Sequence, residues 1–194
     1  REKLKKYKNF HKVRFFIGDI RDKNRILSAF REVDIIIHSA ALKQIDTAEY
    51  NPTEFIDTNI NGSKNIIENA IHNNVKKVIF LSTDKACAPV NLYGATKFCA
   101  EKLFISANNY VGKKIFSVIR YGNVFGSRGS VAPLFLKQRN KKTLTITDTR
   151  MTRFSIELDE CYNMVMWTIQ NTLGGEIVIP KLKSYKVTDL AKAV

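Results

Sequence analysis

The sequence predicts an α/β protein in which helices cover both faces of a parallel sheet. Short runs rich in Val and Ile, of strand length, alternate with longer segments whose apolar residues recur at helical spacing. No internal repeat or low-complexity linker interrupts this alternation. Such an order favours a doubly wound sheet. The 194 residues suffice for one domain with a core, or for one domain and part of a second.

The first expected unit is a strand followed by a helix. Residues 13–17 are an apolar run that Gly18 closes, and we expect a short buried strand there. Asp22 is placed to cap a helix over residues 23–31, with Ile26 on its apolar face.

The second unit begins with residues 33–38, a β-branched run typical of a central parallel strand. Asn51 and Pro52 indicate an N-cap followed by Pro at the first helical position, and the helix is expected to end near Asn73. The residues expected on its inner face are Phe55, Ile56, Ile60, Ile66, Ile67 and Ala70.

The third unit is a strand at residues 75–83 and a helix at residues 91–110, which Gly112 is expected to stop. A further strand is expected at residues 115–124. The remaining expected elements are a helix at 131–141, extended pieces at 143–147 and 152–156, a helix at 159–171, a strand at 176–179 and the start of a helix at 187.

The composition excludes several classes of protein. No apolar run reaches the ~18–20 residues of a membrane span, and no signal peptide opens the sequence. Three cysteines (Cys87, Cys99 and Cys161) without C-x-x-C spacing indicate no disulfide framework, no metal site and a reducing cytoplasm. The net charge of +14 is spread as Lys pairs rather than gathered in a nucleic-acid-binding motif, so a solvated basic surface is expected.

One motif of dinucleotide-binding folds is absent from the sequence. Such folds normally open with a strand, a G-x-G-x-x-G loop and a helix whose N-terminus holds the pyrophosphate. Gly122, Gly126 and Gly129 have a different spacing and context. We therefore expect the chain to start after that phosphate-loop unit, near the third strand of such a fold, and to stop before its C-terminal end.

A tyrosine and a lysine provide the first chemical signal. Tyr93 and Lys97 lie four residues apart in the first turns of an expected helix, so their side chains share a face. Thr83 lies at the carboxyl end of the preceding strand, where open α/β sheets bind ligands. A free phenol has a pKa of about 10, and a neighbouring ammonium favours its phenolate, which can act as a general base.

The Tyr–Lys spacing is weak evidence by itself. Tyr110 and Lys114 repeat it, although Gly112 is expected to end the helix between them. With Thr83 and its strand–loop–helix context, the first pair resembles the short-chain dehydrogenase/reductase superfamily, which implies a Rossmann-like fold of the extended type.

Asp84 and Lys85 narrow this resemblance. Residues 82–97, STDKACAPVNLYGATK, are similar to the UDP-N-acetylglucosamine 4,6-dehydratases of the polysaccharide-biosynthesis branch. Relatives that act on dTDP-glucose carry Asp-Glu at this place, and 4-epimerases lack the acid–base pair. A nonfunctional alternative is that Lys85 only pairs with Asp84 at the strand end, although adjacent ionisable groups in a ligand crevice are expected for acid–base work.

The resemblance implies NADP-dependent 4,6-dehydration of UDP-N-acetylglucosamine to a 4-keto-6-deoxy sugar. Tyr93 is expected to take the 4-hydroxyl proton while C4 gives a hydride to NADP. Lys85, in its neutral form, would remove the C5 proton, and Asp84 would protonate the departing 6-hydroxyl before the hydride returns to C6. Lys97 would hold the ribose and lower the pKa of Tyr93, and Thr83 would orient the sugar. The acid and base roles of Asp84 and Lys85 stay open, because interacting groups titrate as a pair.

The resemblance also implies binding residues, while His38 is expected to be a packing residue. Arg150 is the expected diphosphate partner, since its planar fork matches phosphate oxygens, and Arg153 is either a ligand group or structural. The expected cofactor-binding residues are Asp19, Ile20, Ala40, Ala41, Lys43, Asn59, Ser82, Tyr93, Lys97, Tyr121, Gly122, Asn123 and Val124. The expected substrate-binding residues are Thr83, Lys85, Asn123, Val131, Thr147, Arg150 and Met151.

Further expectations concern the whole protein. The resemblance implies an NADP-binding part in residues 1–126, a sugar-nucleotide-binding part in residues 127–194, and a homo-oligomer. Larger membrane-anchored members carry Met where this chain has Tyr93, which favours the type that inverts C5, as in pseudaminic acid synthesis. Two alternatives stay open: an epimerase or reductase on another nucleotide sugar, and a noncatalytic nucleotide- or nucleic-acid-binding module.

Overall fold

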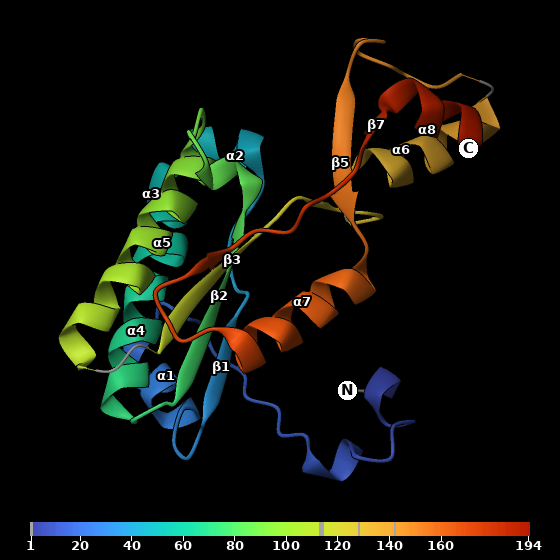
Figure 1. Cartoon of the computed structure of the whole chain (residues 1–194). Coiled ribbons are helices and arrows are strands. Elements are labelled where there is room, and N and C mark those ends of the chain that lie inside the picture. Colours follow the sequence, from blue (N-terminus) through green and yellow to red (C-terminus); the bar gives the residue numbers. More distant parts are fainter. Residues whose placement is uncertain (1, 113–114, 128, 142) are drawn as a thin grey trace.

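A parallel sheet with helices on both faces forms the centre of the molecule (Figure 1). The computed structural model describes residues 2–112, 115–127, 129–141 and 143–194. The strands of this sheet, in spatial order, are β1 (Ile35–His38), β2 (Lys77–Thr83), β3 (Phe116–Tyr121) and β6 (Ile177–Val178). Helices α1 (Lys23–Ala29), α4 (Gly62–His72) and α5 (Leu92–Val111) cover one face, and α7 (Leu158–Asn171) covers the other. The predicted doubly wound α/β fold is confirmed.

The register of the sheet brings the strand ends to one edge. Thr83 of β2 is paired with Tyr121 of β3, and His38 of β1 is paired with Phe80, three residues before the end of β2. Because the strands are parallel, the segments that follow them leave the sheet on the same side, where open α/β sheets bind ligands.

Aromatic rings fill the space between the sheet and α5. The rings of Phe80 and Phe104 stack with centroids 4.6 Å apart, and Phe116 lies at a tilt against Phe104. All three side chains are buried. On the opposite face, Ile79 and Ile119 pack in a second cluster with residues of α7.

Local capping chemistry sets several helix ends where the sequence predicts them. The Asp22 carboxylate accepts a hydrogen bond from the Arg25 backbone at 2.9 Å and begins α1. The Asn91 side-chain oxygen accepts a hydrogen bond from the Gly94 backbone N–H at 2.8 Å and begins α5. Gly112 takes the left-handed conformation, with φ of 64°, and ends α5.

The helix predicted after Pro52 contains a wide turn. It consists of α3 (Pro52–Phe55), a π-helical turn η3 (Ile56–Asn61) and α4, and it follows the short helix α2 (Ile45–Tyr50). The wider turn shifts the helical phase, so Ile56 is 39% exposed and the prediction that it lies inside is wrong, whereas Asn59 is buried. Asn51 precedes Pro52 as predicted, but its amide donates to the Thr47 carbonyl instead of capping.

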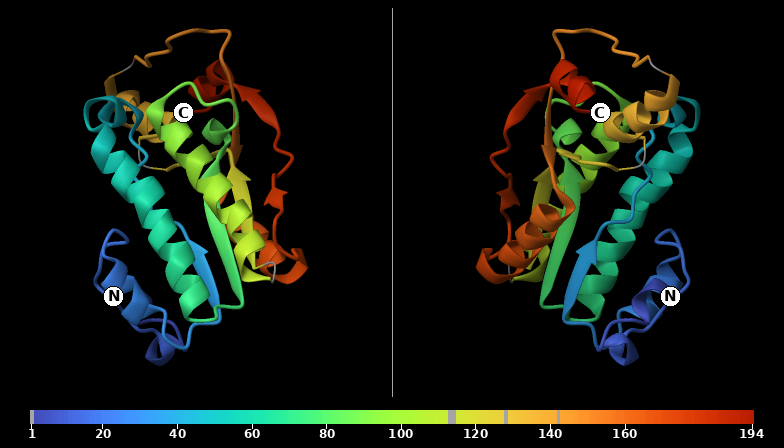
Figure 2. Two further views of the ribbon diagram at one scale, coloured as in Figure 1. Left: turned by 90° about the vertical axis from the view of Figure 1, so that its left-hand side faces the viewer. Right: turned by 90° about the vertical axis from the view of Figure 1, so that its right-hand side faces the viewer.

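A second, smaller sheet lies beyond the carboxyl ends of the first (Figures 1 and 2). It contains β4 (Asn123–Val124), β5 (Thr152–Ile156) and β7 (Ser184–Lys186), with β5 parallel to β4 and antiparallel to β7. Helices α6 (Val131–Gln138) and α8 (Val187–Ala193) lie beside it, and the turn η5 (Arg139–Lys141) completes the helix predicted at 131–141. Strand β7 was not predicted, and no strand forms in the described part of residues 143–147. The division at residue 126 stays a prediction.

One prediction about the first strands is wrong. Residues 13–17 form no strand; Ile17 is 91% exposed, and the neighbouring 3-10 turns are η1 (Glu2–Leu4) and η2 (Phe10–Lys12). Within the described residues β1 pairs only with β2 and lies at the edge of the sheet, and its expected central position stays a prediction. A strand needs a ladder partner, and the sequence pattern alone does not supply one. Of the helices in the described part of the chain, none is long and apolar enough to cross a membrane.

Candidate active site

The predicted catalytic residues gather at the carboxyl end of β2. Thr83 is the last residue of that strand, and its hydroxyl accepts the Lys85 backbone N–H at 3.4 Å, which begins the 3-10 turn η4 (Asp84–Ala86). The chain then enters α5, whose first two turns carry Tyr93 and Lys97. The structure therefore brings together all five residues that the sequence proposes for catalysis.

Asp84 and Lys85 form a partly exposed acid–base pair. The Lys85 ammonium lies 3.1 Å from Asp84 Oδ1, and the two side chains are 32% and 29% exposed respectively. Thr83 donates its hydroxyl to the same carboxylate oxygen at 3.0 Å. Lys85 also donates to Asn123 Oδ1 at 3.4 Å, so the pair reaches β4 of the second sheet.

Tyr93 is almost buried, and its protonated form is favoured. Burial raises the pKa of Tyr93; an opposing hydrogen-bond interaction with Thr83 lowers it, and the charge of Asp84 raises it further. The expectation that Lys97 lowers the pKa of Tyr93 stays a prediction.

Lys97 is a buried lysine at the base of the site. Its side chain is 3% exposed, its ammonium donates to the Leu81 carbonyl at 2.8 Å, and it lies 4.0 Å from the ring centroid of Phe80. Burial lowers the pKa of Lys97 to about 7, and the charge of Glu101 opposes that shift. The lysine thus titrates near neutral pH.

Glu101 and Arg120 are site residues that the sequence prediction missed. Glu101 lies four residues after Lys97 on α5, and Arg120 lies next to Tyr121 on β3. The guanidinium binds the carboxylate in a bidentate manner, with donor–acceptor distances of 2.6 and 2.9 Å. An arginine within the mostly buried strand FSVIRY was the available signal.

The predicted cofactor-binding residue Asn59 links two parts of the site. Its amide donates to the Leu42 carbonyl and accepts from the Leu42 backbone, both at 2.9 Å, which holds the loop that contains Ala40, Ala41 and Lys43. The amide also donates to Thr96 Oγ1 at 3.1 Å. Since Thr96 donates to a backbone carbonyl in the first turn of α5, the loop and the catalytic helix are tied together.

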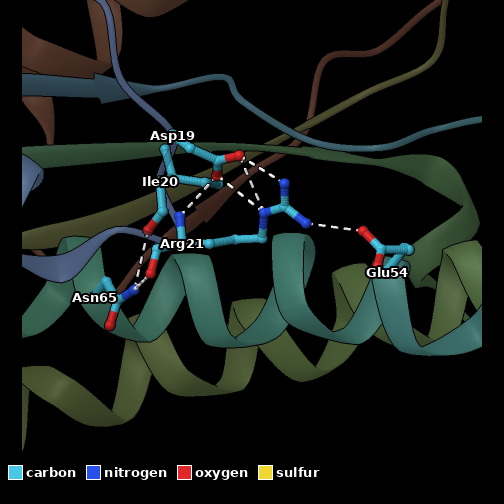
Figure 3. A network of polar contacts seen from close by, with 5 residues as sticks. All are labelled: Asp19, Ile20, Arg21, Glu54 and Asn65. Atoms are coloured by element: carbon cyan, nitrogen blue, oxygen red, sulfur yellow. Dashed lines mark hydrogen bonds and ion pairs between the residues drawn. The ribbon is translucent and has the colours of Figure 1, made fainter.

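The turn predicted to contact adenine is fixed by polar contacts (Figure 3). Asp19 accepts hydrogen bonds from the Arg21 backbone and guanidinium, which lower the pKa of its carboxyl. Arg21 also pairs with Glu54 at 2.8 Å. Asn65 of α4 donates to the carbonyls of Ile20 and Arg21. The turn is thereby attached to the helices behind the sheet.

The remaining predicted cofactor residues lie at the ends of β2 and β3. Ser82 is buried, and its hydroxyl has no hydrogen-bond partner among the described residues. Tyr121 donates its hydroxyl to the Cys161 carbonyl at 3.0 Å, so its side chain faces α7. At Gly122, a Cβ atom would collide with the Phe154 ring. Val124 lies in β4 and is half-buried.

Two cavities flank the segment of Gly122 and Asn123. One, of about 480 Å³, is lined by Asp84, Cys87, Arg120 and Gly122 together with residues of the C-terminal part. The other, of about 260 Å³, is lined by Asn123, Ser130, Val131, Arg153, Tyr185 and their neighbours.

The lining of the smaller cavity distinguishes between Arg150 and Arg153, the two arginines considered as diphosphate partners. Arg153 lines it, whereas Thr147, Arg150 and Met151 do not. The Arg150 side chain is 89% exposed and pairs with Asp148 at 2.8 Å. The geometry therefore favours Arg153 over Arg150 as the cation beside Asn123 and Val131.

Tyr110, the first member of the Tyr–Lys match that we regard as weak evidence, lies in the last turn of α5. Lys114, the partner of Tyr110 in the second Tyr–Lys match, lies outside the described residues, and Tyr110 itself is 77% exposed. Within the part of the chain that the structure describes, no group of three or more His, Cys, Asp or Glu side chains could hold a metal ion.

Comparisons with known proteins agree with this geometry. The family described as "Polysaccharide biosynthesis protein" matches residues 1–194. A protein of Campylobacter jejuni named UDP-N-acetylglucosamine 4,6-dehydratase (inverting) is 53% identical over 100% of this chain and 61% of its own length. A Rickettsia bellii protein named UDP-glucose 4-epimerase is 44% identical over 96% of this chain and 55% of its own length.

The solved structure of Pen from Bacillus thuringiensis superimposes with a TM-score of 0.91 at 40% identity, over 98% of this chain and 61% of that one. This chain thus spans about three fifths of the length of the proteins that it matches.

Proposed function

Since this chain belongs to the polysaccharide biosynthesis protein family of extended short-chain dehydrogenases/reductases, we propose that the complete protein is a UDP-N-acetylglucosamine 4,6-dehydratase. The reaction removes water between C5 and C6 and leaves a UDP-4-keto-6-deoxy sugar. Inversion at C5 and a place in pseudaminic acid or other surface-glycan synthesis are parts of the same proposal.

The Asp84–Lys85 pair is the observation that carries this proposal. A 4-epimerase or a simple reductase needs a proton acceptor for one hydroxyl, which Tyr93 alone can provide. An elimination across C5 and C6 needs in addition a base for a C–H proton and an acid for the departing hydroxyl. Asp84 and Lys85 lie 3.1 Å apart at the end of the same strand, beside Thr83 and Asn123.

The residues present fit a nicotinamide dinucleotide, and NADP is the form that we propose. The unsatisfied, buried hydroxyl of Ser82 is a polar atom that a ligand group could pair with, at the strand end where such folds bind cofactors. Lys97 and Asn59 would hold the nicotinamide side, and Asp19 and Ile20 the adenine side. When bound, the dinucleotide supplies a hydride acceptor at C4 and a hydride donor at C6, and it ends each cycle in its starting state.

The side chains of this chain move the protons. Tyr93 takes the proton of the 4-hydroxyl as C4 is oxidised. The resulting ketone acidifies the C5–H bond, and Lys85, as the free amine, removes that proton. Asp84, as the acid, protonates the 6-hydroxyl, which leaves as water. C5 then takes up a proton from Lys85 or from solvent as C6 is reduced, which gives the 4-keto-6-deoxy sugar. Burial raises the pKa of Tyr93, which opposes the phenolate that this role requires. A bound cationic nicotinamide ring near the hydroxyl would act in the opposite direction and favour the phenolate.

The sugar nucleotide would lie across Gly122 and Asn123, between the two cavities. In the smaller cavity Arg153 provides a planar cation for the diphosphate, with Ser130 and Val131 at the start of α6 beside it. This replaces Arg150, whose guanidinium already pairs with Asp148. We also propose that the complete protein acts in the cytoplasm as a homo-oligomer.

Product analysis of the complete protein with UDP-N-acetylglucosamine and NADP tests the proposal. NMR is expected to show a 4-keto-6-deoxy product from the wild type. Tyr93→Phe should lower kcat by about 10²–10⁴-fold with little change in KM, because it removes the proton acceptor and leaves the binding residues in place. Lys85→Ala should abolish dehydration. Lys102→Ala, an exposed lysine on the same helix, is the matched control and should retain full activity.

The alternative is a 4-epimerase, which the similarity to the Rickettsia bellii protein favours. In that case the wild type would give only the 4-epimer, and Lys85→Ala would retain turnover while Tyr93→Phe would lose it. Deuterium from heavy water provides a second readout. Dehydration exchanges the C5 proton and incorporates deuterium there, whereas epimerisation at C4 does not.

A further inference from the structure

The second sheet carries a row of polar side chains on one face. Arg153 of β5 and Tyr185 of β7 are cross-strand partners in the antiparallel ladder, so their side chains project from the same face. Ser155 follows Arg153 by two residues along β5 and therefore shares that face. Asn123 of β4 is the ladder partner of Ser155. All four residues line the smaller cavity, which agrees with this register.

The row begins at the catalytic pair. Lys85 donates to Asn123 Oδ1 at 3.4 Å, which connects η4 with β4. From β4 to β7 the row crosses two strand spacings, about 10 Å in all. In a UDP-sugar the diphosphate is bonded directly to the sugar ring. A ligand whose sugar lies at Lys85 and Asn123 therefore brings its phosphates next along the row, toward Arg153 and Tyr185.

Two hydroxyls at the far end of the row leave one donor unused. Ser155 Oγ and Tyr185 Oη lie 2.9 Å apart, and either one can be the donor. Each hydroxyl has one proton, and the bond between them uses one of the two. The other proton has no acceptor among the described residues. Both side chains are half-buried and line the cavity, so this proton is available to a ligand there.

The charge of the cavity selects an anionic acceptor. Arg153 is the charged side chain among the described residues that line it, and they include no carboxylate. Its guanidinium donates to the Thr152 carbonyl at 2.8 Å, whereas Arg150 is already paired with an acid. Phosphate oxygens are charged acceptors, and they match a cation that lies beside an unused O–H donor.

We infer that Tyr185 is a second phosphate-binding residue, whose hydroxyl donates to an oxygen of the diphosphate that Arg153 binds. The inference rests on the proposed function for the identity of the ligand, a UDP-sugar. Ser155 is the positioning residue: it donates to the Tyr185 oxygen and thereby directs the phenolic O–H to the ligand. The phenol is the more acidic of the two hydroxyls and hence the better donor to an anion.

Tyr185→Phe in the complete protein tests this role, because it removes the hydroxyl and keeps the ring. Titration calorimetry should show about tenfold weaker binding of UDP, the usual cost of one hydrogen bond to a charged group. The KM for UDP-N-acetylglucosamine should rise by a similar factor, with kcat within about twofold of the wild-type value. Tyr162→Phe, which changes an exposed tyrosine of α7, is the matched control and should bind UDP as the wild type does.

Uridine separates a phosphate contact from other roles of Tyr185. Uridine has no phosphate, so its affinity, measured by NMR shift titration, should be the same for Tyr185→Phe and the wild type. Ser155→Ala should weaken UDP binding by only about threefold, because the Tyr185 O–H remains but loses the partner that orients it. Unchanged UDP affinity in Tyr185→Phe, or an equal loss for uridine, would overturn the inference. These titrations need no turnover, so their failure is distinct from failure of the wild type to dehydrate the sugar.

Discussion

His38 is a buried histidine that the fold holds in its neutral form. Its side chain is 4% exposed and stacks on Phe80 at a ring distance of 5.4 Å, with Phe104 nearby. Its Nε2 lies 3.2 Å from the Ser63 hydroxyl. Burial, and secondly the charge of Lys97, lower the pKa of His38 to about 3. The expectation that His38 is a packing residue agrees with this position.

This neutral histidine predicts a loss of stability in acid. The unfolded chain binds a proton at His38 near pH 6.5, whereas the folded chain binds it only near pH 3. Between these values the unfolded state binds more protons, so the free energy of unfolding falls as the pH falls, by up to about 1.4 kcal/mol per pH unit. From pH 6.5 to 4.5, the wild type should lose about 2 kcal/mol more than His38→Gln in urea unfolding.

The control for this titration is His11→Gln, because His11 is exposed. It should follow the wild-type pH dependence closely. Equal slopes for His38→Gln and the wild type between pH 6.5 and 4.5 would contradict the prediction.

At the scale of elements, the close approach of α5 to the turn η4 sets the positions of the acid–base pair. Gly94 lies in the first turn of α5, and a Cβ there would overlap the Lys85 carbonyl oxygen and press on Pro89. A backbone atom cannot rotate away as a side chain can. The absence of a side chain at Gly94 therefore fixes how near Lys85 comes to Tyr93.

Gly94→Ala tests this contact. Helix propensity favours Ala by about 1 kcal/mol, but the overlap should reverse the sign and cost about 1–3 kcal/mol in the free energy of unfolding. Turnover should fall at least tenfold, because displacement of η4 moves Asp84 and Lys85. Gly62→Ala is a helical comparison: its Cβ would meet Cδ1 and Cγ1 of the Ile20 side chain and leave η4 in place, so its effect should appear in the KM for NADP and not in kcat. A Gly94→Ala protein with wild-type turnover and stability would refute the argument.

Elements were predictable from the sequence where local chemistry decides them. Asp22, Asn91 and Gly112 set helix ends through bonds or backbone conformations within a few residues, and all three lie where predicted. The strand predicted at residues 13–17 does not form, because a strand depends on a partner that is distant in the sequence. The predicted burial of Ile56 is wrong because the π turn changes the helical phase, and a fixed 3.6-residue period does not anticipate that change.

The same distinction applies to the site. The residues from Thr83 to Lys97 are close in sequence, and their spacing on a strand end and a helix start brings them together. Glu101 and Arg120 escaped prediction because their contact requires α5 to lie against β3 in one register. Arg153 could be separated from Arg150 only when the fold placed one of them in a cavity and the other beside Asp148.

At the scale of the whole molecule, the exposed surface is large for the mass. The chain exposes 13106 Å². A compact protein of 22.2 kDa exposes about 9,400 Å² by the usual scaling of area with mass. Part of the excess comes from apolar side chains of β1, where Ile35 and Ile37 are 44% and 47% exposed. Another part comes from α7, where Trp167 is 52% exposed. Surface of this kind is normally covered in a folded protein.

This excess area predicts how the 194 residues behave when they are produced alone. They should bind an apolar dye such as ANS, and the complete protein should bind much less of it, because the added chain or a second copy covers the same faces. The separated chain should also bind NADP at least about 100-fold more weakly, since its sequence has no G-x-G-x-x-G loop to hold the pyrophosphate. Titration calorimetry measures the affinity, and circular dichroism confirms that the separated chain is folded. Tight NADP binding and robust turnover by the 194 residues alone would show instead that the described site is sufficient by itself.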